Sequence, residues 1–147
     1  MAVAQLVNIQ TLLANLIGFM KQRALRFENQ KVLYSKENKI IENEITRKYD
    51  QYKKESFNNI KLLEQVLALT GKLMRELTPD IFSMSVLPPK VYKHYVDYLD
   101  KARSLIAGCK TDMRRLPEAE KILIGMLHRV PDIRKLAKAD ERTPAHL

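Results

Sequence analysis

Residues 2–20, AVAQLVNIQTLLANLIGFM, open a stretch that continues to Leu77 without a proline and with only two glycines, Gly18 and Gly71. All six prolines lie at or beyond Pro79. Glycine and proline are the strongest helix breakers, and the stretch is rich in Leu, Ile, Lys, Glu and Gln. It therefore predicts one very long N-terminal α-helix, or two helices stacked end to end. At about 1.5 Å per residue, such a helix spans on the order of 100 Å.

The first segment of this stretch carries no charge. Its apolar residues recur every three or four positions, at Leu6, Ile9, Leu13, Leu16 and Met20. This spacing predicts one apolar helix face that packs in a coiled coil or bundle. The segment is also about long enough to cross a bilayer. A membrane anchor at residues 2–20 is therefore an alternative, although polar amide side chains weigh against contact with lipid.

The rest of the stretch changes character twice. Residues 21–56 contain sixteen charged residues and predict a solvated helical arm. Residues 57–77 are apolar over a helix face wide enough to need at least two neighbouring helices. The apolar positions expected to make these contacts are Ile60, Leu63, Val66, Leu67, Leu73, Met74 and Leu77. Apolar ends around a charged middle favour a strut. A hairpin that turns near Ser35–Asn38 and lays 3–20 against 57–77 is the alternative, and that turn has no glycine or proline to support it.

The prolines divide the second half of the chain. Thr78-Pro79-Asp80 marks a boundary that predicts a short helix to about Met84. Further helices are expected from Pro89 to Ala107, from near Pro117, and from Pro131 to about Ala139. The fold class is therefore all-α. We expect a helical arm at 1–77, a proline-containing linker with a short helix at 78–90, a small helical bundle at 91–139 and a polar tail at 140–147.

The chain is basic, with a net charge of +9 and a pI near 9.7. Residues 1–77 carry +5 and residues 78–147 carry +4, so the sequence shows no dense basic block. A basic chain favours an acidic neighbour such as nucleic acid, anionic lipid or an acidic protein. The residues that can contact phosphate are Arg114, Arg115, Arg134, Lys135 and Lys138.

No motif for catalysis or metal binding is present. Gly108-Cys109-Lys110-Thr111 lacks the glycines and the preceding strand of a phosphate-binding loop. His94 and Asp97 lie one helical turn apart without a third metal ligand nearby. The single cysteine, Cys109, excludes an internal disulfide. We therefore expect no enzyme activity, no catalytic or metal-binding residues and no cofactor.

Localisation follows from the same features. Residues 1–20 lack the positive charge that begins a signal peptide, and the chain has a single cysteine. An intracellular, reducing compartment is expected.

These observations favour a non-catalytic scaffolding subunit that assembles with other protein subunits, in a homo- or hetero-oligomer. The expected partner-binding residues are the apolar positions of segments 2–20 and 57–77 named above. Two alternatives stay open. One is a nucleic-acid-binding or packaging protein, and the other is a membrane-anchored accessory subunit of a large complex.

Overall fold

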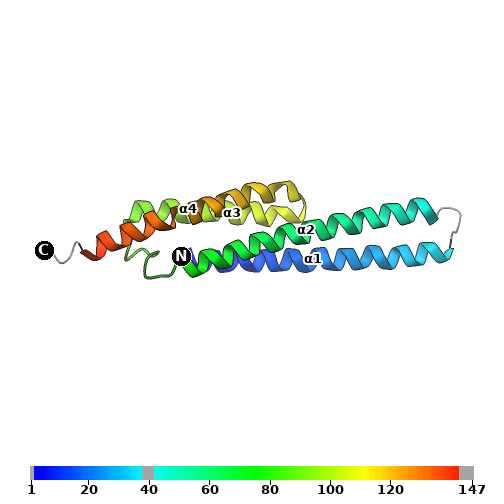
Figure 1. The fold of residues 1–147 in the computed structure, drawn as a ribbon, viewed down its shortest axis with the longest axis horizontal. Coiled ribbons are helices and arrows are strands. Elements are labelled where there is room, and N and C mark those ends of the chain that lie inside the picture. Colours follow the sequence, from blue (N-terminus) through cyan, green and yellow to red (C-terminus); the bar gives the residue numbers. More distant parts are fainter. Residues whose placement is uncertain (1, 38–41, 143–147) are drawn as a thin grey trace.

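A computed structural model describes residues 2–37 and 42–142, with side chains for 4–31 and 46–138. This part of the chain contains four α-helices and no strand (Figure 1). The helices are α1 (Ala2–Glu37), α2 (Glu42–Glu76), α3 (Pro89–Ala107) and α4 (Leu116–Arg142). Two short 3₁₀ helices, η1 (Gly108–Lys110) and η2 (Met113–Arg115), connect α3 to α4. The prediction of an all-α fold is confirmed.

The N-terminal stretch is not one strut, because α1 and α2 lie side by side in opposite directions (Figure 1). The structure therefore corrects the favoured prediction of a single long helix, or of two helices end to end. Burial explains the difference. Antiparallel pairing brings the apolar segments 2–20 and 57–77 together, where each covers the other. The expected turn near Ser35–Asn38 borders residues 38–41, which lie outside the described residues.

The α3–α4 pair packs along the half of this hairpin where α1 begins and α2 ends (Figure 1), and it completes a four-helix bundle. α3 contacts α1, α4 contacts α2, and α3 and α4 contact each other. α1 and α3 run in one direction, whereas α2 and α4 run in the other (Figure 1). The small bundle expected within residues 91–139 is thus completed by the N-terminal helices.

The bundle core consists of side chains contributed by all four helices. Its fully buried members include Leu6, Ile9, Leu13, Leu63, Leu73, Leu77, Leu99, Ile106, Leu123, Met126 and Ile133. Most are leucine or isoleucine at the three- and four-residue spacing of one helix face. Their burial supplies the main stabilising contribution to the bundle, at about 1.5–3 kcal/mol for each fully buried side chain before chain entropy is counted.

The segment between α2 and α3 consists of turns, so the short helix expected up to Met84 is not present. The amide of Phe82 donates to the carbonyl of Thr78, and the amide of Leu87 donates to that of Ser83, in two separate turns. Phe82 is buried between these turns, with its ring centroid 5.5 Å from that of Tyr92. The buried Phe82 side chain anchors the connection between α2 and α3, although this segment does not form a helix.

Helix α4 continues through Pro131, although the sequence predicted a break there. A proline inside a helix removes one backbone hydrogen bond and costs about 3 kcal/mol. Val130 and Ile133, on either side of it, are both buried in the core. The packing of this face offsets the cost of the proline. The helix also includes residues 140–142 of the expected polar tail, whose other residues lie outside the described range.

Candidate partner-binding site

The α1–α2 hairpin extends past the end of the α3–α4 pair as a two-helix projection (Figure 1). We call this projection the stalk and define it as residues 21–37 and 42–57. The bundle ends just before it, where Lys110 Nζ lies 4.9 Å from the ring centroid of Phe19. At 1.5 Å per residue, the stalk projects about 25 Å. Along this length α1 and α2 have each other as neighbours, and their outer sides are open to a ligand.

Aromatic side chains replace aliphatic ones on the inner side of the stalk. The ring centroid of Phe27 lies 5.1 Å from that of Tyr52 and 6.1 Å from that of Tyr49. The guanidinium of Arg23 lies 5.4 Å from the Phe27 centroid, and Lys48 Nζ lies 5.9 Å from the Tyr52 centroid. These rings join the two helices, and cations cover two of them.

Two ion pairs join α1 and α2 across the stalk. Lys53 Nζ donates to Glu28 Oε2 at 2.8 Å, and Lys31 Nζ donates to Asp50 Oδ1 at 2.9 Å. The hydrogen bond from Lys53, with its positive charge, holds the pKa of Glu28 below its ordinary value. The hydrogen bond to Asp50 raises the pKa of Lys31. Both shifts favour the charged forms that make these pairs.

The stalk is basic. Over residues 21–37 and 42–57 the sequence has nine Lys or Arg and six Asp or Glu, a net charge of +3, and eight of the nine cations have described side chains. These eight are Lys21, Arg23, Arg26, Lys31, Arg47, Lys48, Lys53 and Lys54. The hairpin brings the basic segments of α1 and α2 side by side on the stalk, although residues 78–147 carry +4 of the chain's +9 elsewhere.

A groove lies on the outer side of the stalk, next to the bundle. It has a volume of about 390 Å³ and an almost wholly apolar surface. Its lining residues are Lys21, Ala24, Leu25 and Glu28 from α1, with Lys53 and Phe57 from α2. Leu25 is 64 % exposed and Phe57 is 48 % exposed, whereas Ala24 is buried. Two large apolar side chains thus face solvent beside two lysines.

The structure places the expected partner-binding residues inside the chain's own bundle. Ten of them are buried there, namely Leu6, Ile9, Leu13, Leu16, Met20, Ile60, Leu63, Val66, Leu73 and Leu77. The other two, Leu67 and Met74, are partly buried against the same core. Intramolecular packing therefore covers the surface that these residues were expected to offer to another subunit.

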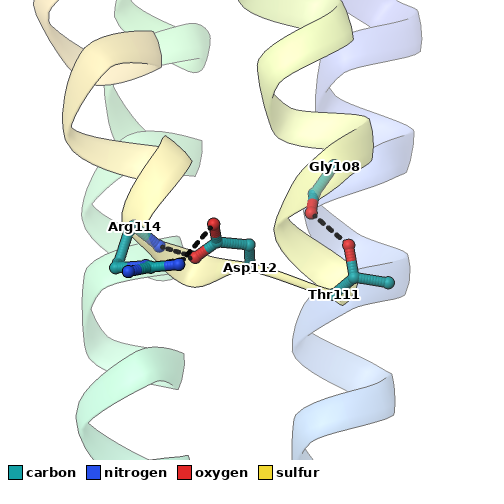
Figure 2. Close-up of polar contacts among 4 residues, drawn as sticks. All are labelled: Gly108, Thr111, Asp112 and Arg114. Carbon is teal, nitrogen blue, oxygen red and sulfur yellow. Dashed lines mark hydrogen bonds and ion pairs between the residues drawn. The ribbon is translucent and has the colours of Figure 1, made fainter.

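The expected phosphate-contacting residues do not form one site. Arg114 donates from Nε and Nη2 to the carboxylate of Asp112, at 2.9 and 3.2 Å (Figure 2). Arg134 forms an ion pair with Glu76, while Lys135 and Lys138 are exposed near the other end of α4. About 30 Å of helix separates Arg115 from Lys135.

The connection between α3 and α4 uses its polar groups internally. The hydroxyl of Thr111 donates to the carbonyl of Gly108 at 3.1 Å, and Asp112 accepts the amide of Arg114 at 3.0 Å (Figure 2). An added Cβ at Gly108 would lie 2.6 Å from Nη1 of Arg115, so that exposed side chain would have to move aside. These contacts make the segment a tight helix-to-helix connection.

Cys109 and His94, the reactive side chains considered in the sequence, both make contacts with neighbouring residues of the bundle. Cys109 is buried and donates to the carbonyl of Leu105 at 3.4 Å, and desolvation raises the pKa of its thiol to about 11. A protonated, buried thiol is a poor nucleophile. His94 stacks on Tyr98 with a centroid separation of 6.3 Å. Among the described residues, no cluster of three or more His, Cys, Asp or Glu side chains is placed to hold a metal ion.

No helix in the described part of the chain is both long enough and apolar enough to cross a membrane. Comparisons with protein families, with curated proteins and with solved structures give no significant match to this chain. The chemistry of the stalk is therefore the basis for a functional assignment.

Leu25 and Phe57 were not among the residues that the sequence singled out for binding. In the linear sequence each belongs to a different segment, and each looks like an ordinary member of its helix. The signal that identifies them is the pairing of Glu28 with Lys53, because an antiparallel pairing of these two residues also brings Leu25 close to Phe57. Such a pair is recognisable only once a hairpin is assumed.

Proposed function

We propose that this chain is a non-catalytic assembly protein in which the four-helix bundle holds the stalk out as a docking element. The observation that carries this proposal is the exposure of Leu25 and Phe57 together on the outer side of the stalk. Large apolar side chains exposed side by side are typical of protein interaction sites. The bundle supports this role because its core leucines and isoleucines are covered by its own helices, although Val7, Leu62 and Ile124 are exposed on its surface.

This proposal keeps the scaffolding function expected from the sequence and moves the contact surface. The buried residues of 2–20 and 57–77 hold the bundle together, and the stalk offers the surface for another subunit. The stalk's position supports a role in assembly, since a partner can reach it without displacing α3 or α4 (Figure 1).

The test is the size of the native complex in extracts of cells that make the protein. A variant with Leu25→Asp and Phe57→Asp is compared with Met84→Asp, because Met84 is 70 % exposed and lies outside the stalk. We expect the wild type and Met84→Asp to elute well above the chain's own mass of 17.1 kDa, and the stalk variant to elute as the free chain. Circular dichroism of the purified variants shows whether the helices are intact.

A free wild-type chain in the extract, or a stalk variant that stays in the complex, would contradict the proposal. Loss of the complex by Met84→Asp as well would place the contact elsewhere on the surface.

Nucleic-acid binding is the second candidate function, and the net charge of +3 on the stalk supports it. A protein held by phosphate contacts loses affinity steeply as salt rises. Binding of the full chain to single- and double-stranded DNA and RNA, measured from low to physiological salt, tests this function. Replacement of Arg26 and Arg47 by glutamine is expected to reduce the salt dependence if the stalk carries the contacts.

A further inference from the structure

The groove on the stalk has the form of a site for one more helix. Lys21, Leu25 and Glu28 follow one another at four- and three-residue spacing on α1, and Lys53 and Phe57 are four residues apart on α2. Rows at these spacings form the holes into which a neighbouring helix inserts its side chains in coiled coils. Ala24 lies between the rows and is buried, so its small side chain leaves room for the inserted group.

The groove also opens on an accessible side. Phe19 faces the end of α3, where it meets Lys110. At about 100° per residue, Lys21 and Glu28 project from α1 on the side roughly opposite to Phe19. A helix lying in the groove therefore has the α3–α4 pair on the other side of the hairpin and does not collide with it.

Charge selects among the possible occupants. The stalk carries +3. At the groove Lys53 is paired with Glu28, and Lys21 adds a further positive charge. A second copy of this chain would bring a stalk of the same charge into contact with the first, and like charges across an interface are costly. An acidic occupant gains from the same charges, and its approach is accelerated by them.

The side chains at the groove favour an acidic protein over a nucleic acid as its ligand. Proteins that bind single-stranded nucleic acid stack its bases on free aromatic side chains. In the stalk, Phe27 and Tyr52 pack on each other and lie beneath Arg23 and Lys48. The open part of the groove is instead aliphatic on one wall, at Leu25, and aromatic on the other, at Phe57. Leucine-like side chains can pack on both walls, whereas a base can stack only on Phe57.

We infer that the stalk groove binds an acidic amphipathic helix from a partner protein, whose apolar side chains pack on Leu25 and Phe57 and whose carboxylates face Lys21 and the lysines beyond it. This inference rests on the proposed assembly function and names the chemical class of the partner. The bound helix turns the two-helix stalk into a three-helix bundle.

The test uses a display library of amphipathic helical peptides of about 20 residues, a length that covers about 30 Å of stalk. The library has a fixed apolar stripe and random residues on the other positions, and it is selected on the immobilised full-length chain. We expect enriched peptides to be rich in Asp and Glu. The best peptide, labelled with a fluorophore, is then titrated with the wild type and with three variants by fluorescence anisotropy.

Phe57→Asp is expected to weaken the binding of this peptide by about tenfold or more, because it removes one apolar wall of the groove and adds a charge of the same sign as the peptide's carboxylates. Lys21→Glu is expected to weaken it less and to lower its salt dependence. Met84→Asp serves as the matched control and is expected to bind like the wild type. Poly-glutamate and oligo(dT) of similar length serve as competitors that offer charge without an apolar stripe.

The proposal is overturned if no peptide is enriched, if the enriched peptides are neutral or basic, or if Phe57→Asp binds them as well as the wild type. It is also overturned if oligo(dT) displaces the peptide as effectively as unlabelled peptide does, since that result assigns the surface to nucleic acid. The proposed assembly function fails separately, through the size of the native complex.

Discussion

The two halves of the α1–α2 hairpin belong to the same pair of helices and are stabilised in different ways. In the bundle half, leucine and isoleucine occupy the inner positions, and α3 and α4 cover them. In the stalk half, the inner positions hold Ala24, Phe27, Tyr49, Tyr52 and Ser56, with ion pairs at the edges. Burial therefore stabilises one half, and a few specific contacts hold the other.

The buried core that stabilises the hairpin and the groove proposed to bind a partner therefore lie toward opposite ends of it. Regions with few buried apolar contacts open locally at a lower free energy than the core. The stalk is such a region, and it also carries the exposed groove. Binding of a partner helix would supply the apolar contacts that α3 and α4 supply in the bundle.

The largest expected effect is the loss of a buried leucine in the bundle half. Leu63→Ala removes a fully buried side chain and is expected to lower the free energy of unfolding by about 2–5 kcal/mol. Leu25→Ala, in the stalk, is expected to change it by less than about 0.5 kcal/mol, because Leu25 is mostly exposed. Urea unfolding followed by circular dichroism measures both. Similar losses at the two positions would show that the halves do not differ as described.

A smaller effect is expected from the aromatic contacts of the stalk. Phe27→Ala removes ring contacts with Tyr49 and Tyr52, each worth about 0.5–1.5 kcal/mol. Amide hydrogen exchange is expected to become faster at described positions 21–31 and 46–57 and to stay unchanged in α3. Tyr98→Ala, on the surface of α3, is the control and should leave stalk exchange as it is. Uniformly faster exchange after Phe27→Ala would mean that stalk and bundle unfold together.

A stabilising change of about 1 kcal/mol or less is expected at Gly18, in the bundle half. An added Cβ there meets nothing within 4 Å, and alanine is a better helix former than glycine. Gly18→Ala should raise the melting temperature by about 2–4 °C at most. Gly108→Ala is the contrasting variant, because its Cβ would lie 2.6 Å from Arg115 Nη1 and the exposed arginine must move aside, so its gain should be smaller than at Gly18. Thermal unfolding of both variants checks the pair.

The smallest effect concerns the charge of one carboxylate in the stalk. The pKa of Glu28 is lowered from its ordinary 4.5, so the ionised form favours the folded stalk. This contribution is present above pH 4.5 and is lost as the pH falls through the lower folded value. Titration of Glu28 by NMR is expected to give a pKa below 4.5 in the wild type and an ordinary one in Lys53→Met. An unchanged pKa in Lys53→Met would rule out the ion pair.

Local features of the fold were predictable from the sequence. The bounds expected for α3, Pro89 to Ala107, are those of the structure, because proline starts this helix and glycine follows its end. Pro131 shows where local rules fail. The sequence marks a helix break there, but buried side chains on both sides keep α4 continuous.

The choice between strut and hairpin depends on contacts between residues far apart in the chain. A breaker-free stretch favours a continuous helix, and the apolar segments at its two ends satisfy either arrangement. The hairpin is favoured because α1 and α2 bury each other's apolar faces. The free energy of this burial comes from residues far apart in the chain and does not show in a local sequence pattern. The stalk groove was unpredictable for the same reason, since Leu25 and Phe57 meet only in the hairpin.

The rate at which the single cysteine, Cys109, is modified is a measure of how often the junction between the stalk and the bundle opens. Cys109 lies next to Lys110, which meets Phe19 where the stalk leaves the bundle. Burial raises the pKa of the Cys109 thiol to about 11, so the thiol is protonated at pH 7 while it stays buried. Modification by a thiol reagent therefore waits for this junction to open, and its rate reports that opening directly. A partner helix that stiffens the stalk down to its base would slow the reaction, whereas one that engages only the outer groove would leave it unchanged.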